Sequence, residues 1–329
     1  MKKNIALIAG GYSGEYVISM KSAAMIKKNI DQALFDVYTI LIDKQEWVCL
    51  LDDGSKVAVD KNDFSVSLTG QKLFFDCAFI TIHGTPGEDG LLQGYLAMMD
   101  IPYTTAGLLP SALTFNKFFC GIVARHFGMH VARSMKLMPG MDIDPDKLIE
   151  TVGLPMFIKP NKGGSSLGNT LVEDKSAVIP AIDLAFEHDD EVLVEAYIRG
   201  QELTCGVYKR DGKPYALPVT AIRSLSGAEF FDYKAKYTKE AAEEITPAPI
   251  PGALTRKVRE TTAMLYEKFE MKGMARIDYI YSDGKLYFLE INVTPGMSDT
   301  SIVPQQAAVE GITVTELFTA VIQDAIKKS

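Results

Sequence analysis

The chain has 329 residues, of which 47% are hydrophobic and 23% charged, and this ordinary globular composition excludes a disordered, collagen-like or coiled-coil chain. Its 42 acidic and 34 basic residues give a formal charge of −8, which argues against nucleic acid as a partner. The absence of a long apolar stretch argues against a membrane, and four isolated cysteines predict a reduced, cytoplasmic setting. A local anion site stays compatible with this charge, because it needs only about three or four cations.

Strands and helices alternate in the first third of the chain. An apolar strand is predicted at 4–9 and a helix at 15–29, with a glycine-rich turn at 10–14 between them. The other elements predicted here are strands at 36–42 and 76–83 and a helix at 88–99. This alternation predicts a parallel sheet with helices on both faces, which is an α/β arrangement.

The middle third mixes short helices and short strands. Helices are predicted at 114–127, 144–152 and 175–187, and strands at 155–159, 170–172 and 191–198. A glycine-rich segment at 162–168 follows the strand that contains Lys159. Its backbone N–H groups, with the hydroxyls of Ser165 and Ser166, have the chemistry to bind phosphate oxygens, although a plain hairpin loop is the alternative. The segment also matches a serine-hydrolase pattern, but no helix is predicted after it, as that fold requires.

The last third contains two predicted hairpins, one around 211–212 and one at 274–293. A polar segment at 223–251 lies between them and is predicted to be a long loop, which in compact domains is usually functional or mobile. Helices are predicted at 254–269 and 313–328.

Four polar residues of the second hairpin could form a metal site. Arg276 and Asp278 share one face of their strand, and Glu290 and Asn292 share one face of the other. A two-residue turn at 283–284 would put the two pairs on opposite faces, whereas a three-residue loop would put all four on one face. Two carboxylates and an amide on one face suit Mg²⁺, and a solvated face with an ion pair is the alternative. We expect the four residues to share a face.

Several segments, taken together and in order, resemble the D-alanine–D-alanine ligase family of the ATP-grasp superfamily over nearly the whole chain. These segments are residues 10–15, 83–84 with 87–90, 159–160 with 164–166, 233–237, 276–278, and 290–292 with 295–297. The resemblance implies an N-terminal Rossmann-like parallel sheet domain at 1–105, followed by a two-part ATP-grasp domain of α+β type. Its two parts are expected at 106–193 and 194–329, with a lid loop at about 223–251.

The resemblance also implies a reaction. A D-alanine carboxylate attacks the γ-phosphate of ATP to give an acyl phosphate, and the amine of a second D-alanine then displaces phosphate. The product, D-alanyl-D-alanine, serves the synthesis of peptidoglycan precursors. The implied cofactor is Mg²⁺ or Mn²⁺, as two ions, and the implied assembly is a homodimer. The alternative is another ATP-grasp carboxylate–amine ligase, such as one that joins D-alanine to D-lactate or to D-serine.

Site residues follow from the resemblance, position by position. For ATP they are the phosphate-binding Lys117, Lys159, Ser165, Ser166 and Lys236, the adenine-binding Glu195, Ala196, Tyr197 and Ile198, and the ribose-binding Glu202. For the metal they are Asp278, Glu290 and Asn292. For the substrates they are Glu15 and His83 at the first D-alanine, Arg276 and Gly296 at the developing oxyanion, and Ser301 and Ile302 at the second D-alanine. Ser165 and Tyr237 are implied to link Glu15 to the lid.

Overall fold

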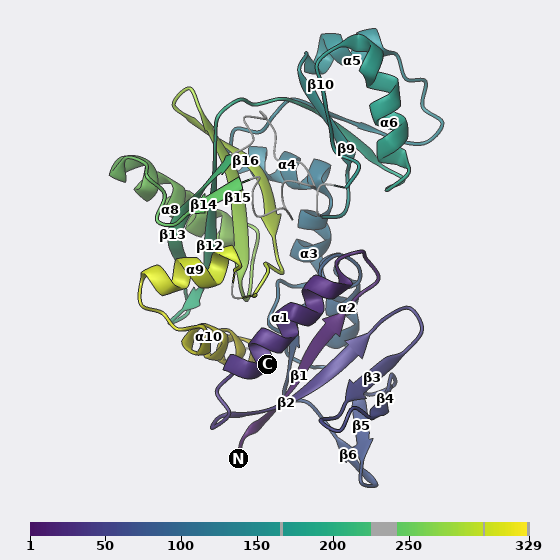
Figure 1. Cartoon of the computed structure of the whole chain (residues 1–329), viewed down its shortest axis with the longest axis vertical. Helices are drawn as coiled ribbons and strands as arrows, with labels where there is room; N and C mark the ends of the chain where they lie inside the picture. Colours follow the sequence, from purple (N-terminus) through teal and green to yellow (C-terminus); the bar gives the residue numbers. More distant parts are fainter. Residues whose placement is uncertain (165–166, 225–241, 299, 328–329) are drawn as a thin grey trace.

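A computed structural model of the chain describes residues 1–164, 167–224, 242–298 and 300–327 (Figure 1). Three sheets organise these described residues, with seven, four and five strands. In Figure 1 the seven-stranded sheet lies at the bottom, the five-stranded sheet at the left, and the four-stranded sheet at the upper right. The α/β class predicted from the sequence is confirmed.

The N-terminal sheet is built on three parallel strands. They are β1 (Lys3–Gly10), β2 (Phe35–Ile42) and β7 (Cys77–Ile80). β1 is buried from Ile5 onward, as expected for a parallel strand covered on both faces. The accompanying helices are α1 (Tyr16–Asn29) and α2 (Leu91–Met98). All five elements confirm predictions.

Four antiparallel strands extend this sheet beyond β2. They are β3 (Trp47–Leu50), β4 (Lys56–Asp60), β5 (Ser65–Leu68) and β6 (Gln71–Leu73). None of these four strands was predicted from the sequence. The sheet is therefore mixed rather than purely parallel, and these short strands form its outer edge.

One predicted helix is in fact two. The helix predicted at 114–127 is replaced by α3 (Leu108–Phe115) and α4 (Lys117–His126). Asn116 separates them with extended backbone angles, and its side chain accepts a hydrogen bond from the N–H of Phe119 at 3.1 Å. This N-cap ends one helix and begins the next, and it makes Lys117 the first residue of α4.

The four-stranded sheet contains β8 (Ser134–Leu137), β9 (Met156–Pro160), β10 (Thr170–Val172) and β11 (Val192–Ala196). β8 was not predicted, and the other three strands were. The helical elements α5 (Pro145–Val152), η1 (Lys175–Ala177) and α6 (Val178–Phe186) belong to the same part of the chain. Apolar side chains of α5 and α6 pack with those of the strands in one buried cluster.

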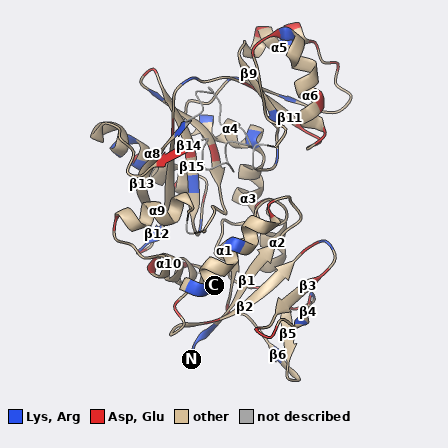
Figure 2. Ribbon diagram, viewed as in Figure 1, with Lys and Arg blue, Asp and Glu red and all other residues tan. Residues whose placement is uncertain are grey.

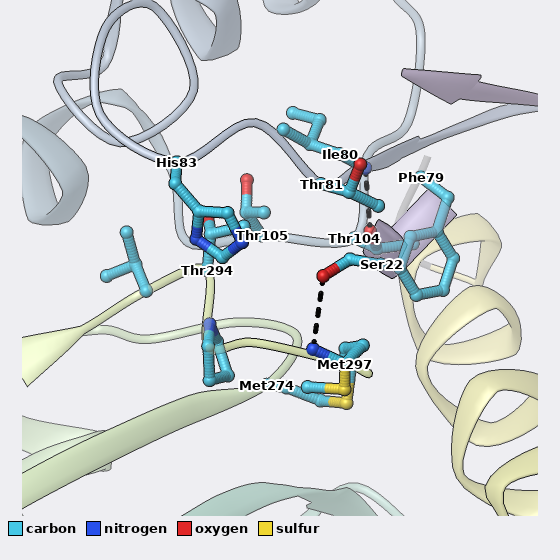
Figure 3. Close-up of a pocket in the computed structure, with 12 residues that line it drawn as sticks. Ser22, Phe79, Ile80, Thr81, His83, Thr104, Thr105, Met274, Thr294 and Met297 are labelled. Carbon is cyan, nitrogen blue, oxygen red and sulfur yellow. Dashed lines mark hydrogen bonds between the residues drawn. The ribbon is translucent and has the colours of Figure 1, made fainter. Parts of the chain in front are cut away.

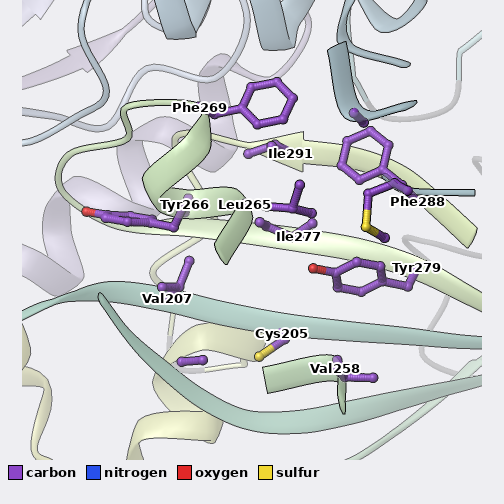
Figure 4. Packing of buried hydrophobic residues seen from close by; sticks show 14 of the residues in the cluster. Cys205, Val207, Val258, Leu265, Tyr266, Phe269, Ile277, Tyr279, Phe288 and Ile291 are labelled. Atoms are coloured by element: carbon purple, nitrogen blue, oxygen red, sulfur yellow. The ribbon is translucent and has the colours of Figure 1, made fainter. Parts of the chain in front are cut away.

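The five-stranded sheet carries both predicted hairpins. Its strands are β12 (Gln201–Arg210), β13 (Lys213–Ser224), β14 (Ala242–Ile245), β15 (Ala275–Ser282) and β16 (Lys285–Asn292). Helix α8 (Gly252–Lys268) packs its apolar side chains, including Leu265 and Tyr266, against Ile277 and other buried residues of the strands (Figure 4). The loop predicted at 223–251 is partly wrong, because β14 within it pairs with β13, and 225–241 lies outside the described residues.

Two C-terminal helices join this sheet to the N-terminal one. They are α9 (Ile302–Val309), which was not predicted, and α10 (Val314–Ile326), which was. Val303 of α9 and Phe318 of α10 belong to one buried cluster with Leu7 of β1 and Tyr208 of β12. The aromatic rings of Phe318 and Phe79 pack edge to face, with 5.6 Å between their centroids. The C-terminal end of the chain therefore fills the space between the two sheets.

Candidate active site

The four polar residues of the β15–β16 hairpin share one face, as expected. In the strand register Arg276 lies opposite Asn292, and Asp278 lies opposite Glu290. The guanidinium group of Arg276 donates two hydrogen bonds to Asp278, at 3.0 and 2.8 Å, and the amide nitrogen of Asn292 donates a third at 2.9 Å. The side chains of three of these residues are therefore in direct contact.

The shared face does not come from a three-residue loop. The turn has two residues, Asp283 and Gly284, both with positive φ, and Ser282 pairs with Lys285 across it. The register shifts farther along, between Asp278 and Tyr279, because Leu289 is an extra residue in β16. This β-bulge changes the parity of the hairpin and brings both polar pairs to one side.

Asp278 is 6% exposed and surrounded by donors. Besides Arg276 and Asn292, the hydroxyl of Thr204 in β12 donates to Oδ1 at 2.5 Å. Each carboxylate oxygen thus accepts two hydrogen bonds, which fills its usual capacity. Thr204 was missed in the sequence, where nothing indicates that β12 lies beside β15.

The donor set on this face fits Mg²⁺. Asp278, Glu290 and Asn292 supply hard oxygen atoms, and Mg²⁺ often takes one or two carboxylates together with substrate phosphates. Among the described residues no group of three His, Cys, Asp or Glu side chains suited to a metal is found. Any ion here would therefore rest on two carboxylates and the amide, and one donor to Asp278 would turn away to admit it.

Two of the predicted phosphate lysines lie near Glu290. Nζ of Lys117 donates to the carbonyl oxygen of Gly163 at 2.6 Å and lies 3.7 Å from Oε2 of Glu290. Lys159 of β9 pairs with Glu195 of the neighbouring strand β11 at 2.5 Å. Burial lowers the pKa of Lys159, but the charges of Glu195 and Glu290 outweigh this and raise it overall. Lys159 is therefore held as a cation beside the glycine-rich segment.

The predicted adenine hinge lies where β11 ends. The N–H of Ala196 donates to the carbonyl of Arg133 at 2.8 Å, and the N–H of Tyr197 donates to that of Pro155 at 3.1 Å. Both N–H groups are therefore bonded within the protein, and a purine at this edge would use other backbone groups of the segment. Glu202, assigned to the ribose, is half-buried near the start of β12.

Glu15 lies where three loops meet. Oγ of Ser13 accepts a hydrogen bond from the N–H of Glu15 at 3.2 Å and donates to the carbonyl of His83 at 2.9 Å. A Cβ atom placed on Gly164 would lie only 3.0 Å from the Glu15 carboxylate, and one on Gly84 would lie 3.9 Å from it. The carboxylate therefore faces both the loop after β7 and the glycine-rich segment.

His83 lines a small cavity between the N-terminal sheet and the segment after β16 (Figure 3). Its Nε2 atom and Oγ1 of Thr294 are buried, and neither finds a hydrogen-bond partner among the residues that the structure describes. Burial lowers the pKa of His83, although the nearby charge of Glu15 opposes this. The ring is therefore neutral at neutral pH.

Glu88 is a further residue at this junction. Its Oε2 accepts from the N–H of Gly84 at 2.7 Å, and its Oε1 accepts from the N–H of Thr294 at 3.3 Å. Burial raises the pKa of Glu88 to about 8, while the hydrogen bond from Gly84 opposes the shift. The residue belongs to the segment 87–90 that carries the family resemblance, but no role was predicted for it. It connects the loop after β7 to the segment after β16.

The predicted site of the second substrate lies at the start of α9. A Cβ on Gly296 would lie 2.9 Å from Oγ of Ser301, so a larger residue here would push the Ser301 hydroxyl from its present position. Oγ of Ser301 also accepts from the N–H of Ser298 at 3.0 Å. Ile302 is the first residue of α9, and helix N-termini favour anionic groups.

The structure thus brings predicted residues from distant segments together in pairs, Lys117 with Glu290 and Lys159 with Glu195. Figure 2 shows basic and acidic residues on the ribbons of the same five-stranded sheet, so both signs of charge lie there. Four predicted residues lie outside the described ranges: Ser165, Ser166, Lys236 and Tyr237.

Comparisons with known proteins show the family of this chain. The family models described as D-ala D-ala ligase N-terminus and C-terminus match residues 4–106 and 123–323. The chain is 46% identical over 325 residues to D-alanine–D-alanine ligase of Phocaeicola vulgatus, which covers 98% of this chain and 99% of that protein.

Two solved structures have the same fold. VanG D-Ala:D-Ser ligase from Enterococcus faecalis superposes with a TM-score of 0.87 at 31% identity, covering 98% of this chain and 99% of that one. D-alanine–D-alanine ligase from Bacillus anthracis complexed with ATP superposes with a TM-score of 0.79 at 30% identity, covering 99% of this chain and 98% of that one. The chain belongs to the D-alanine–D-alanine ligase family.

Proposed function

We propose that this enzyme joins two D-alanine molecules into D-alanyl-D-alanine at the expense of ATP, through an acyl phosphate, for peptidoglycan precursors. The observation that carries the proposal is the polar face of the β15–β16 hairpin. There Asp278 and Glu290 lie opposite each other, and Lys117 approaches Glu290 to 3.7 Å. Carboxylates for a metal thus stand beside a cation for phosphate, and phosphoryl transfer requires both.

The first step makes the carboxylate of one D-alanine a good acyl donor. Negative charge on the phosphoryl oxygens would be met by Lys117 and Lys159, which reach the site from α4 and β9. A magnesium ion held by Asp278, Glu290 and Asn292 would neutralise further phosphate charge when bound. The carboxylate of Glu15 would bind the ammonium group of this first D-alanine.

The second step needs stabilisation of a tetrahedral oxyanion. Arg276 and the backbone N–H of Gly296 are the proposed donors, since oxyanion stabilisation by preorganised donors is often the largest catalytic effect. Ser301 and Ile302, at the N-terminus of α9, would bind the carboxylate of the second D-alanine. Ser165, Tyr237 and Lys236 are proposed to act with the lid at 223–251, which would keep water from the acyl phosphate.

We propose three domains for this enzyme, with ATP between the second and third. Each contains one of the three sheets, which supports the division. The sequence-based boundaries at 105 and 193 need one adjustment, because β11 stays paired with β9 up to Ala196. We therefore place the second boundary at the end of β11.

The remaining partners are also proposals. We propose that the enzyme uses Mg²⁺ or Mn²⁺ as two ions, forms a homodimer and acts in the cytoplasm, apart from nucleic acid and membranes. No helix in the described part of the chain is long and apolar enough to cross a membrane. Sedimentation analysis will test the dimer, and activity after metal removal and re-addition will test the ions.

The reaction is tested by measuring ATP-dependent phosphate release with D- and L-amino acids in the presence of Mg²⁺. We expect release with D-alanine alone and none with L-alanine, and a dipeptide product detectable by mass spectrometry. D-lactate and D-serine should be poor second substrates at neutral pH. A clear preference for either would replace this proposal by the alternative ligase, and similarity to the D-Ala:D-Ser ligase makes D-serine the critical competitor.

A further inference from the structure

Gln306 is a fully buried amide that connects α9 to the five-stranded sheet. Its Nε2 donates to the carbonyl of Thr204 at 3.1 Å and to Oγ1 of Thr220 at 3.0 Å. Its Oε1 accepts from the N–H of Gly206 at 2.9 Å. One side chain on the helix thus contacts both β12 and β13, and its polar atoms are satisfied inside the core.

The sheet is shaped to receive this amide. The register between β12 and β13 shifts between Cys205 and Val207, and Gly206 lies in the irregular position. A Cβ atom on Gly206 would lie 2.6 Å from Oε1 of Gln306, so glycine is required for the approach. At the bulge Gly206 is left out of the pairing with β13, and its N–H instead donates its hydrogen bond to Gln306.

The strand that Gln306 contacts also supports the proposed catalytic residues. In the β12–β15 register Thr204 lies opposite Asp278, and Gly206 lies opposite Arg276. The hydroxyl of Thr204 donates to Asp278 at 2.5 Å. Gln306 therefore holds the backbone of the residue whose side chain holds Asp278.

The other end of the connection is the proposed second-substrate site. Gln306 lies on the same short helix, Ile302–Val309, that begins at Ser301 and Ile302. Loss of its three hydrogen bonds would free this helix to shift relative to β12. A small displacement between two reacting groups has a large effect on rate, because reaction needs a close and aligned approach.

We propose that Gln306 is a positioning residue that holds the second D-alanine in register with Asp278 and Arg276, and this inference rests on the proposed function. It acts through α9 on one side and through Thr204 on the other. It does not touch substrate.

The test compares Gln306→Met with Thr262→Val. Methionine has a similar size but cannot make the three hydrogen bonds. Thr262 is the matched control, because its buried hydroxyl forms a hydrogen bond with Tyr279 at 2.8 Å in the same domain, and neither residue is among the proposed site residues. We expect Gln306→Met to raise KM for the second D-alanine by about tenfold, with KM for ATP nearly unchanged. Thr262→Val should lower the melting temperature without this shift in KM.

A double-mutant cycle with Thr204→Val tests the route of the effect. If Gln306 acts through Thr204, the changes in kcat/KM of the two single variants will not add in the double variant. Additive changes would overturn the route, and an unchanged second KM in folded Gln306→Met would overturn the proposal. If Gln306→Met does not fold, Gln306→Glu retains the acceptor for Gly206 and is expected to raise the same KM.

Amide hydrogen exchange separates this inference from the proposed reaction. Gln306→Met should speed exchange at Gly206 and in β15 around Asp278 more than Thr262→Val does, with no substrate present. Equal exchange in the two variants would overturn the coupling whatever the substrate is. A wild-type enzyme that releases no phosphate with D-alanine would instead overturn the proposed function.

Discussion

Asp278 shows how much one buried carboxylate depends on its neighbours. It accepts hydrogen bonds from residues of three strands, Thr204 on β12, Arg276 on its own strand β15 and Asn292 on β16. A buried charge is tolerated only when it is paired and hydrogen-bonded in this way. The same contacts hold the carboxylate in place, and one of these donors would have to turn away before a metal ion could bind to it.

Removing one of the two carboxylate charges should stop the reaction. Asp278→Asn and Glu290→Gln each keep the size of the side chain but remove a negative charge from the proposed metal face. We expect phosphate release to fall by more than about a hundredfold, because a metal with weaker ligands no longer neutralises the phosphates. Circular dichroism should show the fold intact, and near wild-type activity in either variant would contradict the metal assignment.

His83 predicts a pH effect on stability. Because burial lowers its pKa in the folded state, the unfolded chain binds a proton on this residue at a higher pH than the folded chain does. The free energy of unfolding contributed by His83 should therefore fall as pH decreases below about 6.5. Glu15 and Arg276 are the charged groups that modify this pKa.

The measurement compares melting temperatures of wild type and His83→Gln at about pH 7.5 and about pH 5.5. The melting temperature of the wild type should fall more between the two pH values than that of His83→Gln. His126→Gln, at an exposed position, is the control for loss of a histidine. An equal loss in wild type and His83→Gln would show that His83 does not contribute.

At the scale of single elements, the bulge in β16 decides whether the site exists. Leu289 is the extra residue that places Glu290 opposite Asp278 despite a two-residue turn. Strand side chains alternate between faces, so a shift of one residue sends every following side chain to the other face. A polar pattern on two strands is therefore insufficient without the register between them.

Inserting one residue between Leu289 and Glu290 should break the site while leaving most of the hairpin. With the bulge kept, the inserted residue would take the position opposite Asp278, and Glu290 and Asn292 would turn to the other face. We expect loss of phosphate release with this insertion and retention of most activity with Leu289→Ala, which keeps the register. Activity in the insertion variant near that of Leu289→Ala would contradict the dependence of the site on this register.

At the scale of the whole molecule, C-terminal helices hold the N-terminal sheet against the five-stranded sheet. Phe318 of α10 is fully buried, and the centroid of its ring lies 5.6 Å from that of Phe79 in β7. Glu88 adds a polar connection from the loop after β7 to Thr294. These contacts hold the loop that carries His83 beside the segment after β16.

Phe318→Ala should therefore weaken the whole assembly. Truncation of a buried phenylalanine costs about 3–5 kcal/mol, through lost burial and the cavity that remains. Denaturant unfolding should show this loss, and KM for D-alanine should rise with it. Phe74→Ala, at a side chain that is 56% exposed, is the control and should change the free energy of unfolding by less than about 1 kcal/mol. A similar small change in Phe318→Ala would contradict this role of α10.

Local patterns were sufficient for much of the fold. The apolar run of β1, the turn residues Asp283 and Gly284, and the periodicity of α8 each identify an element without reference to the rest of the chain. The edge strands β3 to β6 and helix α9 were missed because their residues are short runs whose stability depends on neighbouring strands. The break at Asn116 was missed because it depends on one hydrogen bond, from the N–H of Phe119 to the Asn116 side chain, and the pattern of apolar residues does not reveal that bond.

The sequence by itself determined the family, the α/β class and the residue types of the site, because these depend on local order and on motifs. The tertiary structure decided which of those residues meet. Three features depend on strand register and on packing between separate segments: the bulge at Leu289, the contact of Thr204 with Asp278, and the hydrogen bonds of Gln306. The partners in the last two are 74 and 102 residues apart in sequence. Such contacts leave no local signal, since their free energy arises only when the strands and helices are already assembled.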